Sequence, residues 1–160
     1  VGLGPGSHAG IRSAIAIAQG WQLARGIQLL GMISVEVLAW EAFRQGLKGR
    51  VHVASDAQRG EFHLATYGLD ATMPHPAEPL RLASLAEVEA LIQQGECVVG
   101  PDLTARLPRA VDLYPRAATL GRLAATRSDF IAGEKLEPIY LRETNFMKAP
   151  PPRFGSGRPL

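Results

Sequence analysis

The amino-acid sequence predicts a mixed α/β (α+β) fold, and three observations support this prediction. Segments with apolar residues at helical spacing alternate along the chain with short apolar runs that are typical of strands. The periodicity changes from helical to strand-like near Lys48, which indicates a boundary between two lobes. The 160 residues are 46% hydrophobic and 20% charged, which is enough apolar material for a buried core.

The first predicted element is a tight turn at 4–10 that leads into a helix from Gly10 to Arg25. Three glycines and a proline in this stretch favour a turn over a regular element, and Ser7 stands near the N-cap position of the helix. Gly26 ends the helix. Apolar residues nearly encircle it, so we expect the helix to be buried on two sides or to contact a partner.

The next elements are predicted from caps, periodicity and turn residues. Ser34 caps a second, amphipathic helix that Gly46 ends, and the turn at 56–60 joins two strands into a hairpin. In chain order these elements are a strand at 27–32, the helix at 35–45, and strands at 51–55 and 61–67.

The second half of the chain has one clear helix start. Ser84 and Glu87 form a capping box for a helix that runs to Gln94, where Gly95 stops it. The prolines of 73–79 predict a loop. The other expected elements are an edge strand at 80–82, strands at 97–100 and 111–114, a helix from Pro115 to about Thr126, an extended stretch at 138–142, and a disordered tail from Lys148.

The charge distribution gives no sign of a broad nucleic-acid surface. The 17 basic and 15 acidic residues give a net charge of +2, but Lys148, Arg153 and Arg158 lie in the tail, which leaves the rest of the chain at −1. The single Cys97 excludes an intrachain disulfide framework and indicates a reducing compartment. Because no apolar run reaches membrane-spanning length and no signal peptide is recognisable, we expect a cytoplasmic protein without membrane contact.

Catalytic signatures are few, which weighs against a self-contained enzyme. The sequence contains no nucleophile elbow, zinc helix, Walker loop or dinucleotide fingerprint. Of the four histidines, only His52 and His63, on the two arms of the hairpin, are expected to face each other, and a zinc site would need a third ligand. We therefore expect no metal site.

Two polar features have both a structural and a functional interpretation. Asp56, Arg59 and Glu61 cluster at the hairpin turn, where a carboxylate could orient a base, although turn aspartates more often accept hydrogen bonds from their own backbone. Arg12 could contact a phosphate or pair with an acid. The turn at 4–10 could cradle an anion or pack closely on a neighbouring strand, and the residues leave these alternatives open.

Three motifs carry a resemblance to a known family. They are Gly-Pro-Gly-Ser-His-Ala-Gly-Ile-Arg at 4–12, Asp-Ala-Gln-Arg-Gly-Glu at 56–61 and Pro-Ile-Tyr-Leu-Arg at 138–142. In order and spacing they resemble the motifs of the TsaB (YeaZ) family of bacterial tRNA threonylcarbamoyladenosine biosynthesis proteins, which are glycoprotease-like. The resemblance covers residues 1–142. The departures are His8, Ala9, Gln58 and His63, where the family has Phe, Thr, Arg and Tyr.

The resemblance implies an actin-like ATPase fold of two RNase H-like lobes. The family's N-terminal segment, with an Asp-Thr phosphate motif, is absent from this sequence, so we expect an N-terminally truncated chain with an incomplete first lobe. The implied domains are 1–46 as the remainder of the first lobe, 47–112 as the second lobe, 113–147 as a helix and strand that return to the first lobe, and 148–160 as the disordered tail.

The resemblance also implies a function. It predicts a non-catalytic scaffold that pairs with the catalytic TsaD paralogue, and with the ATPase TsaE, to place threonylcarbamoyl on the adenosine next to the anticodon of tRNA. In isolation the family forms homodimers, and tRNA is contacted through the complex. No cofactor is expected on the chain alone, and ATP or ADP could bind only at a site shared with the partner subunits.

The family makes its partner contact, and its homodimer contact, through the first two helices of the first lobe, of which this chain keeps only the second, at 10–25. No catalytic residue is expected. The alternatives are a peptidase or ATPase of the glycoprotease-like family, and a homodimerisation module without a tRNA role. The expected site residues are Ile11, Ser13, Ala14, Ile15, Ile17, Ala18, Trp21 and Gln22 for the partner; Gly4, Pro5, Gly6, Ser7, Gly10 and Arg12 for an anion; Asp56, Arg59, Gly60 and Glu61 in the hairpin turn; and Pro138, Tyr140, Leu141 and Arg142 in the C-terminal motif.

Overall fold

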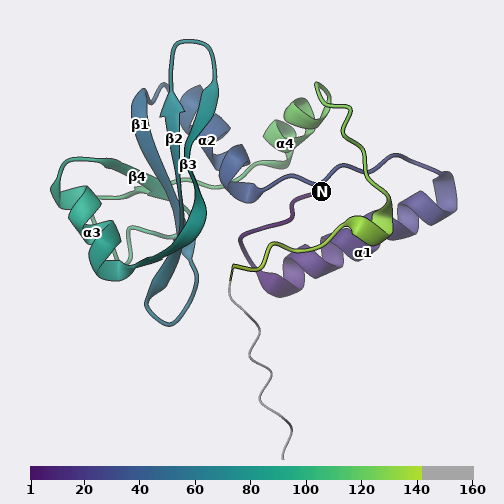
Figure 1. The fold of residues 1–160 in the computed structure, drawn as a ribbon, viewed down its shortest axis with the longest axis horizontal. Helices are drawn as coiled ribbons and strands as arrows, with labels where there is room; N and C mark the ends of the chain where they lie inside the picture. Colours follow the sequence, from purple (N-terminus) through teal and green to yellow (C-terminus); the bar gives the residue numbers. More distant parts are fainter. Residues whose placement is uncertain (142–160) are drawn as a thin grey trace, which may run out of the picture.

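The structure is a computed structural model that describes residues 1–141 of the chain. The tail that the sequence predicts to be disordered, and Arg142 of the C-terminal motif, lie outside the described residues. The described chain has two parts side by side, a sheet with its covering helices and a smaller part around one long helix (Figure 1).

A five-stranded mixed sheet forms the larger part. Three strands make an antiparallel meander: β1 (Gly49–Asp56), β2 (Glu61–Leu69) and β3 (Pro74–Ser84). Two short strands, β4 (Cys97–Gly100) and β5 (Val111–Asp112), continue the sheet beyond β1 in parallel register. The order β3-β2-β1-β4-β5 is that of an RNase H-like lobe, in agreement with the fold that the family resemblance implies.

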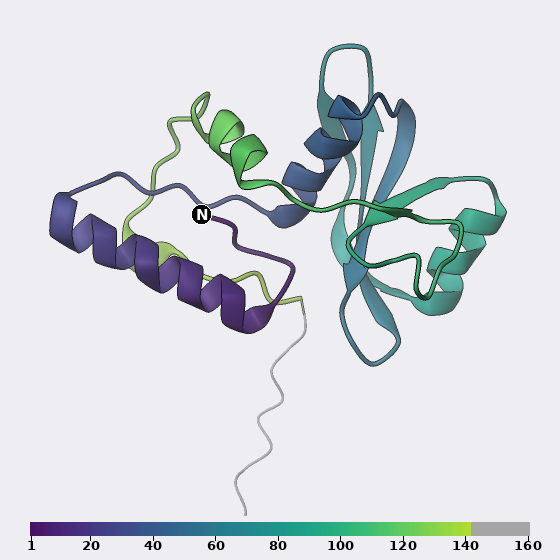
Figure 2. The same cartoon turned by 180° about the vertical axis from the view of Figure 1, so that it is seen from behind.

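Helices cover both faces of this sheet, because its strands are apolar on both sides. The helix α2 (Ser34–Arg44) buries Val35 and Leu38 against one face, and α3 (Leu85–Gln93) buries Val88 against the other. Successive strand residues point to opposite faces, so Val53 belongs to the first cluster and its neighbour Ala54 to the second. Figures 1 and 2 show the two sides of this arrangement.

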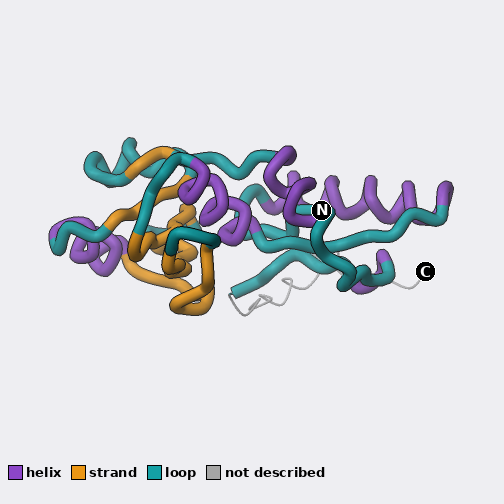
Figure 3. The backbone as a smooth tube through the Cα atoms, turned by 90° about the horizontal axis from the view of Figure 1, so that it is seen from above, coloured by secondary structure: helices purple, strands orange, loops and turns teal. Residues whose placement is uncertain are grey.

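The smaller part is built from segments that are far apart in sequence. The helix α1 (His8–Arg25) packs on the 3₁₀ turn η1 (Gly133–Lys135), and Ile15, Ala18 and Leu29 form a small cluster there. In Figure 3 α1 lies at the end of the molecule away from the strands. A further helix, α4 (Ala117–Ala124), lies between the two parts beside α2 (Figure 1).

The predicted helices are present, but their ends differ. α1 begins at His8 rather than Gly10, because the Ser7 Oγ caps the helix by accepting a hydrogen bond from the Gly10 N–H at 3.3 Å. Ser34 is the first residue of α2 and not its cap; Ile33 holds the cap position without a side-chain hydrogen bond. α4 begins after Arg116, whose backbone is extended, and not at Pro115, and it ends at Ala124.

The strand predictions are correct for the hairpin and for 97–100 and wrong at three other places. The predicted strand at 27–32 makes only isolated bridges, because Leu29 and Met32 meet different neighbours. The predicted loop at 73–79 is the first half of β3, which also contains the predicted strand at 80–82. The predicted strand at 111–114 is limited to β5.

Prolines fit into β3 because it is an edge strand. β3 stands at one end of the sheet order, so a residue without a backbone N–H removes no bond from a strand beyond it. Pro74 pairs in register with Leu69 and Pro76 with Tyr67, and the register shifts between these pairs and Leu64 mark an irregularity in the ladder.

Candidate functional site

The glycine-rich turn before α1 packs against the start of α2. The Gly4 carbonyl accepts a hydrogen bond from the Ser34 N–H at 2.7 Å, and a Cβ on Gly4 would lie 2.8 Å from the Ile11 Cδ1 atom. Gly4 has a φ of 96°, which favours glycine. This geometry supports the close-packing interpretation of the turn, and it fixes the direction in which α1 leaves.

One face of α1 is buried against the chain itself. Ile15 and Ala18 are 5% and 6% exposed. The Gln19 Nε2 donates to the Gly133 carbonyl at 2.7 Å, and the Gly133 N–H donates to the Gln22 Oε1 at 2.8 Å. A Cβ on Gly133 would lie 2.6 Å from that Oε1 atom, so α1 and η1 are matched closely. These contacts occupy part of the surface that the sequence assigned to a partner.

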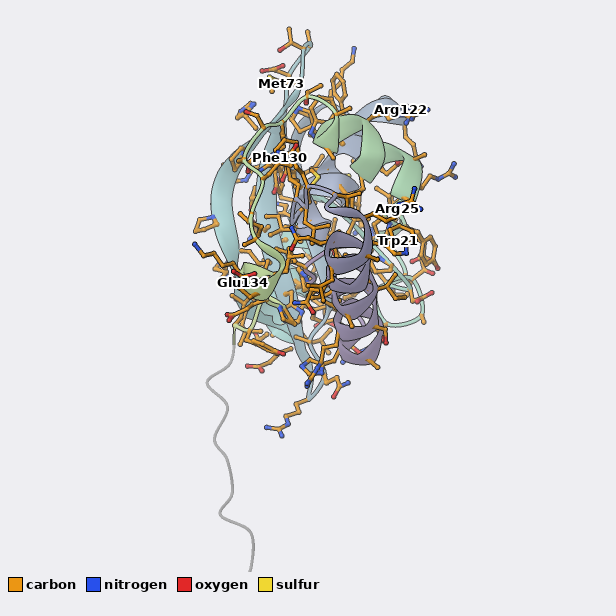
Figure 4. The ribbon with its side chains drawn as sticks, turned by 90° about the vertical axis from the view of Figure 1, so that its right-hand side faces the viewer. Trp21, Arg25, Met73, Arg122, Phe130 and Glu134 are labelled. Carbon is orange, nitrogen blue, oxygen red and sulfur yellow. The ribbon has the colours of Figure 1, made fainter. Side chains whose placement is uncertain are left out.

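The neighbouring face of α1 is apolar and exposed. Ile17 is 58% exposed and Trp21 is 63% exposed, and Ala14 lies one turn before them on the same side. We call Ala14, Ile17 and Trp21 the α1 stripe. Figure 4 shows Trp21 pointing away from the body of the molecule. The eight residues expected at the partner surface therefore divide into an exposed group, Ser13, Ala14, Ile17 and Trp21, and a group packed inside the chain, Ile11, Ile15, Ala18 and Gln22.

The α1 stripe forms one wall of an open apolar groove of about 460 Å³. The other walls come from residues that the sequence did not single out, since Val1, Ile27, Ala124 and Phe130 share no motif or helical period. Only their placement around α1 brings them together. Phe130 is 43% exposed, so the groove is an apolar surface open to solvent.

The turn before α1 and the hairpin turn meet at a small cleft of about 250 Å³. Gly6 and Ser7 line it from the first motif, and Ser55 and Asp56 from the end of β1. Arg106 reaches in from the segment after β4, with its Nη1 atom 3.3 Å from the Asp56 Oδ1. The structure thus brings two of the three sequence motifs to one place, where the lining includes the carboxylates of Asp56 and Asp102 and the guanidinium of Arg106.

Within the hairpin turn Asp56 has a structural role. Its Oδ1 accepts a hydrogen bond from the Gln58 N–H at 2.8 Å, which is the local backbone bond typical of a turn aspartate. Gln58 and Arg59 adopt φ values of 63° and 56°, and Gly60 has 79°. Gln58, Arg59 and Gly60 therefore form a tight left-handed turn at the tip of the hairpin, and Glu61 begins β2.

The described part of the C-terminal motif packs near the start of α1. The Ile139 N–H donates to the Leu3 carbonyl at 2.9 Å, and the Tyr140 ring lies 5.3 Å from the His8 ring, centroid to centroid. The first and last motifs are thus neighbours in space although they are separated by the whole sheet in sequence. Nothing is described for Arg142.

The two hairpin histidines do not face each other, so that expectation is wrong. His52 pairs in register with Thr66, and His63 pairs with Ser55. Because the two register positions, 52 and 55, are three positions apart along β1, the two side chains lie on opposite faces of the sheet. Within residues 1–141, no group of three or more His, Cys, Asp or Glu side chains is placed to hold a metal ion.

The fold and the cleft define a class of protein. An RNase H-like sheet lobe beside a second, smaller part, with a glycine-rich turn at the cleft between them, is the arrangement of actin-like proteins with RNase H-like lobes. No helix in the described residues is long and apolar enough to cross a membrane.

Comparison with curated proteins gives the particular family. The chain is 33% identical to the tRNA threonylcarbamoyladenosine biosynthesis protein TsaB of Escherichia coli, over 88% of this chain and 68% of that protein. It is 36% identical to TsaB of Buchnera aphidicola over 40% of this chain and 30% of that protein. The chain belongs to the TsaB family.

Comparison with solved structures agrees with this assignment. A Pseudomonas aeruginosa protein described as similar to the peptidase YeaZ matches with a TM-score of 0.72 and 25% identity, over 88% of this chain and 71% of that one. YeaZ from the same organism matches with a TM-score of 0.71 and 24% identity, over 88% and 72%. No family model matches the sequence.

Proposed function

We propose that this chain is a non-catalytic scaffold subunit in the synthesis of threonylcarbamoyladenosine in cytoplasmic tRNA. In this proposal it binds the catalytic TsaD paralogue, works with the TsaE ATPase, and reaches tRNA through the complex. Membership of the TsaB family supports the pathway. The α1 stripe is the observation that supports the scaffold role, because the apolar side chains of Ile17 and Trp21 are more than half exposed on a continuous helix.

The α1 stripe has the properties of a protein-protein contact. An exposed apolar groove bounded by a long helix is unusual on a monomer surface, and a tryptophan flanked by an aliphatic residue is the composition of an interface hot spot. The neighbouring face of α1 is fixed on η1 by the two Gly133 hydrogen bonds, so the stripe is presented by a helix that is already held in place. We propose that the same stripe makes the homodimer of the isolated chain.

Burial supports a role without catalysis. One histidine that lies close to a hydroxyl is His52, with its Nδ1 3.0 Å from the Thr66 Oγ1. This pair could be mistaken for a nucleophile and its base. His52 is 2% exposed and Thr66 is fully buried within the sheet, so no substrate reaches the hydroxyl. We propose that ATP or ADP binds only at a site shared with partner subunits, for which the cleft at Ser7 and Asp56 is the candidate.

A charge placed on the α1 stripe tests this proposal. Ile17→Asp in the full chain, co-expressed with a tagged TsaD paralogue, should reduce co-purification at least about tenfold, because burying an isoleucine at a contact stabilises it by about 1.5–3 kcal/mol. Threonylcarbamoyladenosine in cellular tRNA, measured by mass spectrometry of nucleosides, should fall in parallel. Ile15→Asp is unsuitable because Ile15 is buried and its loss would unfold α1.

Leu23→Asp is the matched control. Leu23 is 89% exposed on α1 but lies on the flank away from the stripe, so the same change of chemistry should leave the complex intact. If Ile17→Asp co-purified with the TsaD paralogue as well as the parent does, the α1 stripe would not be the interface. If depletion of the chain left threonylcarbamoyladenosine in tRNA unchanged, the alternative of a homodimerisation module without a tRNA role would be favoured. Peptide or ATP turnover by the isolated protein would favour the enzyme.

A further inference from the structure

A second groove lies between α2 and α4, on a different surface from the α1 stripe. Its volume is about 440 Å³. The two helices that bound it, α2 and α4, lie side by side in Figures 1 and 2. Nothing in the proposed scaffold function uses it. Its lining residues are Trp40, Phe43, Arg44, Thr119, Arg122, Leu123 and Thr126.

The walls of this groove are aromatic and aliphatic. The rings of Trp40 and Phe43 meet edge to face, with centroids 5.8 Å apart and planes at 87°, and both rings are only partly buried. Leu123 of α4 closes the opposite side. A flat ring that entered the groove would meet an indole, a phenyl ring and an isobutyl group, which is a suitable surface for stacking.

Two arginines at the rim give the groove a positive edge. The Arg44 Nη1 donates to the Thr119 Oγ1 at 3.1 Å, and this bond holds the guanidinium against the groove. Arg122 lies on the exposed side of α4 (Figure 4). Within residues 1–141, neither guanidinium comes within 4.0 Å of a carboxylate oxygen.

A buried carboxylate lies behind the rim and limits its charge. Glu41 is 5% exposed, and the Thr119 hydroxyl donates to its Oε1 atom while accepting from Arg44. Glu41 therefore offsets one of the two positive charges, and the edge of the groove carries a net charge near +1. This charge matches one anionic group better than a chain of phosphates.

We propose that the groove binds a nucleoside monophosphate. The base packs between Trp40 and Leu123, and the phosphate accepts hydrogen bonds from the guanidiniums of Arg44 and Arg122, which fit phosphate oxygens in planar pairs. The volume of about 440 Å³ lies in the range of small-ligand pockets. Such pockets are lined mostly by apolar side chains with a few polar groups, as this groove is. A free nucleotide suits the site better than a nucleic acid, because the chain outside its tail has a net charge of −1.

Tryptophan fluorescence of the full chain tests this proposal. Trp21 and Trp40 are the two tryptophans, so Trp21→Phe leaves Trp40 as the reporter. AMP should quench its fluorescence in a saturable manner, whereas adenosine and inorganic phosphate, which each supply half of the ligand, should bind at least about tenfold more weakly. Arg122→Gln should weaken AMP binding about tenfold, and Arg44→Gln should do the same.

The controls separate binding from loss of structure. Arg25→Gln on α1 removes an exposed arginine that does not line the groove and should leave the affinity for AMP unchanged. Because Arg122 is exposed, Arg122→Gln should keep the circular dichroism spectrum of the parent, so a loss of affinity there reports on the site. The proposal is overturned if AMP gives no saturable change, if adenosine binds as tightly as AMP, or if Arg122→Gln binds AMP like the parent. It is also overturned if Arg122→Glu changes the oligomeric state in sedimentation, because the groove is then a contact between chains.

Discussion

At the scale of single residues, the environment of His52 fixes its tautomer. The Thr66 Oγ1 donates its hydrogen to the Glu78 Oε2 at 3.2 Å, so it can only accept from the His52 Nδ1. The imidazole proton is therefore on Nδ1, and the Nε2 atom lies 3.5 Å from the Glu96 Oε2. Burial lowers the pKa of His52, because the charged ring would lose its hydration, and the opposing effect of Glu96 is smaller.

This lowered pKa predicts that stability falls as the solution becomes acidic. The unfolded chain binds a proton near pH 6.5 and the folded chain only at lower pH, so the stabilisation is complete above 6.5 and is lost as the pH falls through the folded pKa. Urea unfolding between pH 7.5 and 5.5 should show this loss, and His52→Leu should flatten the slope in that window. His75→Gln removes an exposed histidine and should retain the slope of the parent; a parental slope in His52→Leu would show that another group titrates.

Gly100 illustrates what a sequence cannot reveal about a single position. A Cβ there would lie 1.8 Å from the Ala54 carbonyl oxygen, because Gly100 follows Val99, which pairs in register with Val53. The local sequence shows only that Gly100 precedes a proline, a pattern that indicates the end of a strand. The requirement for glycine at position 100 comes from Ala54, 46 positions earlier in the chain, so the local sequence around Gly100 cannot indicate it.

At the scale of elements, local chemistry predicted helix starts better than strand lengths. Ser84 was expected to cap α3, and its Oγ does accept from the Glu87 N–H at 3.2 Å. The reciprocal half of the capping box is not formed, because the Glu87 carboxylate pairs with the Arg81 Nη2 at 2.6 Å. The length of β3 depended instead on its place at the edge of the sheet, which a proline count cannot show.

The half-formed box predicts unequal costs for its two residues. Ser84→Ala leaves the Glu87 N–H without its acceptor and should lower the free energy of unfolding by about 1 kcal/mol. Glu87→Gln removes only a surface ion pair, whose partners are 42% and 43% exposed, and should cost about 0.5 kcal/mol or less. Ser84→Asp keeps a capping oxygen and should be close to the parent in chemical denaturation. Equal costs for the first two substitutions would mean that Glu87 completes the box in solution.

At the scale of the whole molecule, the family motifs predicted more of the fold than periodicity did. The glycine-rich turn, the hairpin turn and the C-terminal motif identified an RNase H-like arrangement, and the first two meet at one cleft. The spacing of apolar residues in 10–25 indicated a partner contact. It could not show that Ile15 packs inside the chain with Leu136 whereas Ile17 is exposed. That difference depends on η1, more than 100 residues further along the chain. The site therefore became specific only when distant segments were placed around α1.

The two parts of the molecule should differ in local stability. The sheet is held by large apolar clusters on both faces, whereas α1 rests on a small cluster with Leu29 and Leu136 and on two hydrogen bonds to Gly133. Local opening needs less free energy where fewer apolar groups are buried. Hydrogen exchange followed by mass spectrometry should therefore show at least about tenfold lower protection for amides in α1 than for those in β1.

The Gly133 contacts offer a way to separate this local opening from global unfolding. Gln22→Ala removes the acceptor of the Gly133 N–H, so exchange in α1 should become faster while exchange in β1 stays at the rate of the parent. Binding of the TsaD paralogue through the α1 stripe should have the opposite effect and slow exchange in α1, since a partner that binds only the ordered helix stabilises it by mass action. Equal hydrogen-exchange protection of α1 and β1 in the free chain would instead mean that the two parts unfold as one cooperative unit. Binding of the TsaD paralogue would then make the α1 stripe no more rigid than it already is.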